Sequence, residues 1–118
     1  MDSKKFHVLS FKYALSGIIA ALKEEPNLKF HFLVGILVIV LSFLLKISKG
    51  DFIILILLIG FVIALELTNT ATEAVVDRVI QTDHSGAKLA KDISAGAVLI
   101  SAITAALVGL WIILPYFF

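Results

Sequence analysis

The chain has 118 residues, of which 60% are hydrophobic and 16% charged, and its formal net charge is +1. This composition is typical of an integral membrane protein, and the near-neutral charge argues against nucleic acid as a partner. The sequence contains no cysteine, which excludes disulfides and thiolate metal sites.

The N-terminal segment, residues 5–23, has the pattern of an amphipathic helix that lies in the membrane interface. Lys12 interrupts any signal-peptide core, so we expect the segment to stay on the protein. The break at residues 24–27, which contains Pro26, turns the chain toward a first membrane span. The apolar residues recur at helical spacing and oppose most of the polar ones: Val8, Phe11, Leu15, Ile18, Ile19 and Leu22 against Lys5, Lys12, Ser16 and Lys23.

Three apolar segments follow, and each reaches the length of about 20 residues that a bilayer span needs. They cover residues 28–47, a stretch from Phe52 to near Ala71, and residues 93–118. We expect a short outer turn at residues 46–51, a short inner turn at residues 81–86, and Trp111 and Tyr116 in the aromatic belt of the outer interface. No repeat or linker divides the sequence, so residues 1–118 are predicted to form a single all-α membrane domain.

The distribution of lysine and arginine predicts the orientation of the spans. Five basic residues precede the first span, two lie between the first and second, three lie between the second and third, and none follows the third. By the positive-inside rule, the N-terminus and the loop at residues 78–91 are cytoplasmic, and the C-terminus is outside.

Four polar side chains form one stripe on the helix of the second span. Glu66, Asn69, Glu73 and Asp77 fall within a sector of about 80° on a helix that turns about 100° per residue. Ionisable groups inside a bilayer cost about 2.5 kcal/mol or more each, so they persist where they face a protein interior or a wet cavity. The stripe therefore predicts a functional site.

One chain with three spans and a surface helix cannot enclose such a stripe alone, so we expect an oligomer. The third span carries small residues at a spacing of three to four, which lets another helix approach closely. These residues are Ala87, Ala90, Ser94, Ala97, Ser101 and Thr104.

The depth of the stripe indicates its chemistry. Glu66 is expected within the inner leaflet, with Glu73 and Asp77 roughly 10 and 16 Å further toward the cytoplasm. Carboxylates suit Mg²⁺ shared with substrate phosphates, and Lys88 and Lys91 could meet phosphate oxygens. From these residues alone, a lipid-headgroup enzyme and an ion-translocating subunit both remain open; the sequence has no Walker or dinucleotide-binding glycine loop.

The strings ALELTNTATEAVVDRV (residues 64–79) and AKLAKDISAGAVL (residues 87–99) resemble the signature of the prokaryotic diacylglycerol kinase family of integral-membrane lipid kinases. With LKEEPNLKFH (residues 22–31), the resemblance covers nearly everything from Phe11 onward. The start of the first span and the A-G-A-V-L run are most similar to the Gram-positive members, which act on undecaprenol rather than chiefly on diacylglycerol.

This resemblance implies a homotrimer in the bacterial cytoplasmic membrane, with active sites shared between subunits, that transfers the γ-phosphate of Mg-ATP to a lipid hydroxyl. Glu66 would be the general base, and Glu73 and Glu25 would hold Mg²⁺. Phe6 replaces the usual arginine near the start of the surface helix, where Lys5 or Lys12 could substitute. The nucleotide would be contacted by Tyr13, Asn69, Asp77, His84, Lys91 and Asp92.

Simpler interpretations compete with these roles. Glu66 and Asn69 could join helices within an oligomer, and Glu25 could be a solvated charge beside a proline turn. His31 and His84 show no paired-ligand spacing, which favours a snorkelling or loop role. Lys91 and Asp92 could cap the third span. A ring subunit with Glu66 as its proton or cation carrier, or a membrane scaffold, are the alternatives of other classes.

Overall fold

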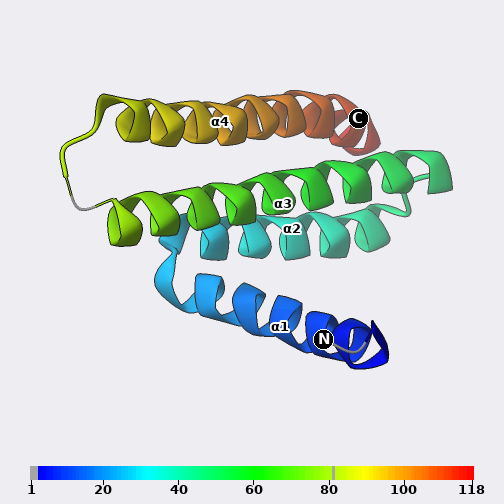
Figure 1. Cartoon of the computed structure of the whole chain (residues 1–118). Coiled ribbons are helices and arrows are strands. Elements are labelled where there is room, and N and C mark those ends of the chain that lie inside the picture. The colour runs from blue at the N-terminus through cyan, green and yellow to red at the C-terminus, as the bar shows by residue number, and fades with distance from the viewer. Residues whose placement is uncertain (1–2, 81) are drawn as a thin grey trace.

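The computed structural model describes residues 3–80 and 82–118, with side chains from Ser10 onward; the side chains of Lys5 and Phe6, and Gln81, lie outside this part. The chain folds into four helices, α1 (Ser3–Glu24), α2 (Pro26–Leu45), α3 (Lys49–Val79) and α4 (Ser85–Ile113), and a final 3₁₀ turn, η1 (Leu114–Phe117). In Figure 1, α3 lies between α2 and α4, and α1 diverges from the bundle.

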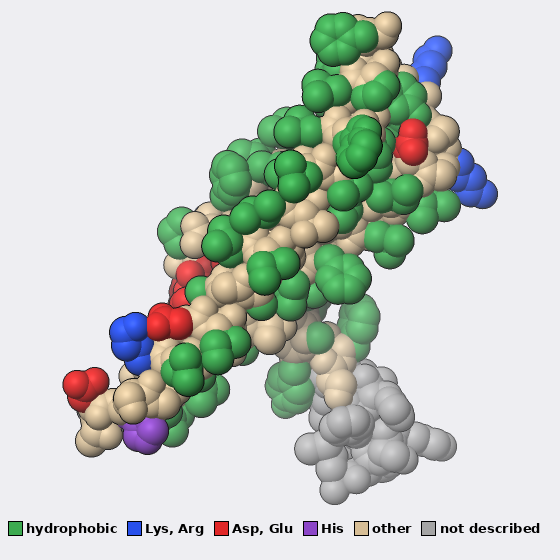
Figure 2. Space-filling model, turned by 90° about the horizontal axis from the view of Figure 1, so that it is seen from above, with side chains coloured by type: hydrophobic (Ala, Val, Ile, Leu, Met, Phe, Trp, Pro, Cys, Tyr) green, Lys and Arg blue, Asp and Glu red, His purple; other side chains and the backbone are tan. Residues whose placement is uncertain are grey.

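Three of these helices are long and apolar enough to cross a membrane: α2, α3, and α4 together with η1. This confirms the predicted three-span, all-helical architecture. Figure 2 shows why the class is unambiguous: hydrophobic side chains cover the length of the molecule, and charged ones gather toward its two ends. A single chain leaves most of this apolar surface exposed, as expected where lipid or another chain provides the cover.

The helix boundaries differ from the predicted ones at both turns. The α2–α3 turn is shorter than residues 46–51, because Ser48 caps α3 by accepting a hydrogen bond from the Asp51 N–H at 3.2 Å, so helix begins at Lys49. The α3–α4 turn ends two residues earlier than predicted, because His84 caps α4, which begins at Ser85: its Nδ1 accepts hydrogen bonds from the Gly86 and Ala87 N–H groups. Capping side chains at these positions replace the missing intrahelical partners.

The joint between α1 and α2 is fixed by Pro26. Proline disfavours helical geometry at the residue before it, and Glu25 is extended, with φ −109° and ψ 107°. Pro26 itself starts α2, where its missing N–H costs nothing. The predicted helix at residues 5–23 is therefore present, but Phe11 and Leu15 are more than half exposed in the single chain. Its membrane-surface role stays a prediction.

The α2–α3 pair packs closely at Gly35. A Cβ at this position would lie 2.9 Å from Ile59 Cγ2, so only glycine permits this approach. Leu28 and Ser42, seven residues to either side of Gly35, are also buried on the same face of α2. At the far end of the bundle, the Tyr116 hydroxyl donates to Asp51 Oδ2 at 2.6 Å and accepts from the Ser48 N–H at 3.0 Å. Tyr116 thus ties η1 to the α2–α3 turn, a contact that its assignment to an aromatic belt did not include.

Candidate active site

The acidic stripe lies on one unbroken helix. α3 continues to Val79, so the helix carries the four side chains beyond the apolar segment without a kink that would rotate them apart. Their exposure rises along the helix: Glu66 and Asn69 are buried, Glu73 is half-buried, and the Asp77 side chain is 57% exposed. The predicted gradient from a buried carboxylate to a water-accessible one is present in the fold.

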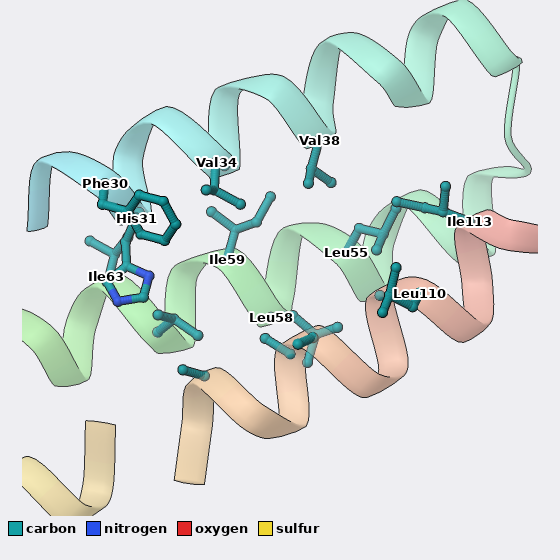
Figure 3. A pocket seen from close by; sticks show the side chains of 16 residues that line it. Phe30, His31, Val34, Val38, Leu55, Leu58, Ile59, Ile63, Leu110 and Ile113 are labelled. Carbon is teal, nitrogen blue, oxygen red and sulfur yellow. The ribbon is translucent and has the colours of Figure 1, made fainter. Parts of the chain in front are cut away.

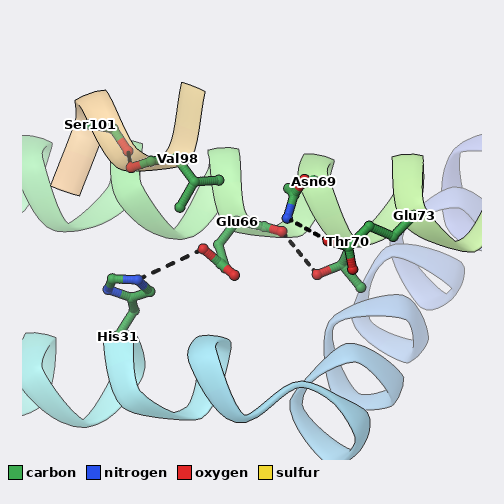
Figure 4. Close-up of polar contacts among 7 residues, drawn as sticks. All are labelled: His31, Glu66, Asn69, Thr70, Glu73, Val98 and Ser101. Atoms are coloured by element: carbon green, nitrogen blue, oxygen red, sulfur yellow. Dashed lines mark hydrogen bonds and ion pairs between the residues drawn. The ribbon is translucent and has the colours of Figure 1, made fainter. Parts of the chain in front are cut away.

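Glu66 faces α2 and meets His31. The Nε2 atom of His31 lies 3.7 Å from Glu66 Oε2, an ion-pair distance too long for a direct hydrogen bond (Figure 4). The Glu66 side chain is only 4% exposed, and its Oε2 accepts no hydrogen bond within the described chain. The Thr70 hydroxyl bonds to the backbone carbonyl of Glu66 and leaves the carboxylate untouched.

His31 is the site residue that the sequence analysis missed. A snorkelling role is wrong for it, because its side chain is 20% exposed and is directed at α3. The available signal was its spacing: His31 precedes Gly35 by four residues and so shares the face of α2 that approaches α3. Gly35 packs against Ile59, and α2 and α3 run antiparallel. His31, one turn before Gly35 on α2, therefore lies opposite the part of α3 about one turn after Ile59, in the direction of Glu66.

Asn69 links the buried and accessible parts of the stripe. Its Nδ2 donates to Glu73 Oε1 at 3.2 Å, while its buried Oδ1 has no hydrogen-bond partner in the described chain. The carboxylates of Glu73 and Glu25 both lie close enough to Glu66 to act on it electrostatically. Glu66 is therefore subject to the charges of two further carboxylates, one on the same helix and one at the α1–α2 joint.

A cation from α4 balances the outer part of the stripe. Lys91 Nζ donates to Asp77 Oδ1 at 2.8 Å, which joins α4 to α3. Asp92 instead accepts from Lys88 at 2.6 Å on the exposed side of α4. The interpretation of Lys91 and Asp92 as a helix cap is wrong, because His84 performs that function and both residues lie nearly two turns into the helix.

A cavity of about 470 Å³ opens beside this pair at the α3–α4 end of the bundle. It brings together four of the six residues expected to contact a nucleotide, Asp77, His84, Lys91 and Asp92. Asn69 lies about two turns before Asp77 on α3 and does not line the cavity. Tyr13 lies on α1 with a 66% exposed side chain, and it does not line the cavity. The full set of lining residues is Val76, Asp77, Ile80, Thr82, Asp83, His84, Lys88, Lys91 and Asp92.

A second cavity, of about 430 Å³, lies between α2, α3 and α4 (Figure 3), and the α3 residues that line it precede Glu66 along the helix. Its walls are aliphatic, with Leu55 and Leu58 from α3 and Leu110 and Ile113 from α4. His31 is the polar side chain at its end. Along α3, Glu66 thus lies between the residues that line the apolar cavity and those that line the charged one, and it lines neither.

The carboxylates are better suited to a metal ion that phosphate and water also coordinate than to one held by protein side chains alone. Among the side chains that the structure describes, from Ser10 onward and apart from Gln81, no three acidic or histidine side chains come close enough to hold an ion alone. Glu25 and Glu73 each act electrostatically on Glu66 and offer hard oxygen ligands, which suit Mg²⁺ completed by phosphate oxygens and water. Asn69 Oδ1, buried and unpaired, is a further oxygen on this face.

Comparison with known proteins gives the relatives of this chain. The sequence profile described as prokaryotic diacylglycerol kinase matches residues 12–113. The chain is 41% identical over 106 residues to an undecaprenol kinase of Bacillus subtilis, which covers 90% of this chain and 86% of that protein. It is also 41% identical over 109 residues to a diacylglycerol kinase of Synechocystis, covering 92% of this chain and 62% of that protein. A diacylglycerol kinase of Pseudomonas aeruginosa is 35% identical over 85 residues, which are 72% of this chain and 69% of that one.

Proposed function

The chain belongs to the prokaryotic diacylglycerol kinase family and is a membrane-bound lipid kinase, and we propose that it transfers the γ-phosphate of Mg-ATP to the hydroxyl of undecaprenol. The kinase relatives exclude the ring-subunit and scaffold alternatives. Diacylglycerol is the alternative acceptor, because the matched relatives include kinases named for each lipid.

The observation that carries the proposal is the buried carboxylate of Glu66, whose Oε2 accepts no hydrogen bond and which lies along α3 between the residues of the apolar cavity and those of the charged one. In this mechanism, Glu66 takes the proton of the lipid hydroxyl. The hydroxyl oxygen forms a bond to the γ-phosphorus while the bond from that phosphorus to the bridging oxygen breaks, which releases ADP. A positioned base of this kind contributes about 10²- to 10⁴-fold in rate.

The remaining stripe residues would hold the nucleotide. Glu73 and Glu25 would bind Mg²⁺, which neutralises charge on the transferred phosphoryl group when it is bound with ATP. Asn69 and Asp77 would line the nucleotide path, and Lys91, already 2.8 Å from Asp77, would exchange its carboxylate partner for a phosphate. Tyr13, His84 and Asp92 complete the proposed nucleotide contacts.

Undecaprenol is supported by the match to the Bacillus subtilis protein over most of both chains, and by the LKEEPNLKFH and AGAVL strings. The test is a radiolabelled-ATP assay of the purified protein with both lipids in matched micelles. For two alcohols that differ in their apolar tails, pocket discrimination gives a ratio of about 10- to 200-fold in kcat/KM. A preference for diacylglycerol would reassign the acceptor, and labelling of neither lipid would refute the proposed function.

The active form is proposed to be a homotrimer with shared sites, embedded in the cytoplasmic membrane with its N-terminus inside and C-terminus outside. Ala90 and Ala97 support this assembly, because both are exposed on α4 in the single chain and could meet a neighbouring helix. Ser94 and Ser101 are half-buried, and Ala87 is buried within the chain itself. The small-residue face is therefore only partly available to a neighbour.

A further inference from the structure

We propose that His31 is a positioning residue for this kinase: its imidazole keeps the Glu66 carboxylate ionised and holds it toward the acceptor hydroxyl. The inference rests on the proposed role of Glu66 as the base. It begins from the 3.7 Å approach of His31 Nε2 to Glu66 Oε2 across the α2–α3 interface. Gly35 fixes this approach, since a side chain there would push α2 away from Ile59.

A base must be deprotonated before it can accept a proton, and the surroundings of Glu66 oppose that state. The side chain is 4% exposed, so water does little to stabilise its charge. The other ionisable groups that act on it, Glu73 on the same helix and Glu25 at the α1–α2 joint, carry the same sign. Like charges at short range favour the neutral form of a carboxylate.

Of the groups that act on Glu66 within the described part of the chain, His31 is the one that can carry a positive charge. Lys91 is committed to Asp77 on a later turn of α3. A histidine suits this position because it can carry a proton near neutral pH, yet a neutral imidazole is tolerated when the carboxylate becomes protonated during turnover. A permanently charged lysine or arginine would be left unpaired at that moment.

The imidazole also lies at the boundary between two environments. One side of His31 borders the aliphatic cavity lined by Val34 and Ile63, and its Nε2 is directed at Glu66. A hydroxyl that comes to Glu66 from the apolar side therefore arrives next to the imidazole. Its position orients a carboxylate whose Oε2 accepts no hydrogen bond within the described chain.

The test combines a double-mutant cycle with a variant series in the full-length protein. His31→Phe should lower kcat by about 10- to 100-fold, the range seen when orienting partners of site residues are removed, with the KM for ATP changed less than about twofold. His31→Gln should recover only a small part of this loss, because its amide supplies a polar N–H at this position but carries no charge. Leu37→Ala is the matched control, since Leu37 lies on the same helix, is 58% exposed and lines neither of the two cavities.

The cycle separates positioning from a merely structural effect. In a Glu66→Gln background, His31→Phe should change the residual rate by less than about twofold, because the residue acts through the carboxylate that is already absent. Multiplicative losses in the double variant would overturn the proposal, as would a fully active His31→Phe protein.

Infrared spectroscopy gives a readout that does not depend on turnover. The protonated-carboxyl band of Glu66 should be absent in the wild type, appear in His31→Phe, and disappear again when Glu66→Gln is added. A wild-type protein that already shows this band refutes the role of His31. If the wild type phosphorylates neither lipid, the proposed function fails, while the infrared series still decides whether His31 keeps Glu66 ionised.

Discussion

Replacing Glu66 with glutamine is the sharpest test of the proposed mechanism, because it changes one atom of a buried side chain. Gln has nearly the same shape, and the hydrogen bond at this position uses the backbone carbonyl, so α3 should remain intact. What is lost is the ability to take a proton. A positioned base contributes about 10²- to 10⁴-fold, so kcat should fall at least a hundredfold, which corresponds to about 2.7 kcal/mol of transition-state stabilisation.

The stability of the same variant distinguishes a base from a polar link between helices. Glu66 makes no side-chain hydrogen bond to another helix in the described chain, and its contact with His31 across the α2–α3 interface is 3.7 Å long. Glutamine keeps the shape of the side chain and removes the cost of burying an ionised group that is only 4% exposed. We therefore expect an unchanged melting temperature and oligomer. A helix-joining role would instead weaken assembly by about 1 kcal/mol.

The assay is phosphorylation of the lipid by purified protein, with thermal unfolding and gel filtration measured on the same samples. Thr68→Val is the control: the Thr68 hydroxyl bonds to the Ala64 carbonyl of its own helix on the exposed side, so the change removes a polar group without touching the stripe. It should keep the wild-type rate. A Glu66→Gln protein that retains most of its turnover, or one that loses activity only in proportion to its oligomer, would refute the base assignment.

Three further outcomes follow from the site. Glu73→Gln and Glu25→Gln should each raise the Mg²⁺ and ATP concentrations for half-maximal rate more than they change the lipid dependence. Titration of Mg²⁺ checks this. An unchanged Mg²⁺ requirement in Glu25→Gln would mean that Glu25 is a solvated charge and not a metal ligand. Lys91→Ala should raise the KM for ATP by about tenfold or more, since a charge-assisted phosphate contact contributes about 1.5–3 kcal/mol. An unaltered KM would mean that Lys91 only forms the ion pair between α4 and α3. Ala97→Leu should dissociate the oligomer in cross-linking and gel filtration, whereas Ala95→Leu, exposed on the other side of α4, should not; an active monomeric wild type would contradict shared sites.

The helices were predictable because hydropathy and helical spacing act locally. The spans at residues 28–47 and 93–118 and the stripe on the second span follow from patterns within one segment, and the structure confirms them as helices. The turn boundaries were less predictable. Ser48 and His84 extend α3 and α4 by a few residues through single capping contacts, and histidine is not among the residues that usually predict a cap.

Contacts between helices were beyond reach of the sequence pattern, because they depend on the register of two antiparallel helices. Nothing local to His31 says that it meets Glu66, and nothing local to Lys91 says that its partner is Asp77 rather than Asp92. The register is set by close packing at Gly35 and by the short Ser48 turn. A one-turn shift of α2 along α3 would separate His31 from Glu66 by about 5 Å more.

The unbroken geometry of α3 explains how donor and acceptor could meet at a membrane surface. On the proposed mechanism, the lipid hydroxyl lies at Glu66 and the nucleotide near Asp77, about 16 Å along the helix axis for 11 residues. Glu73 lies between them, so a triphosphate that extends from the Asp77 end would reach Glu66 after passing Glu73. A rigid helix keeps this separation constant, whereas a break within residues 66–77 would let the two ends move independently. Continuity of α3 is therefore a requirement of the chemistry as well as of the fold.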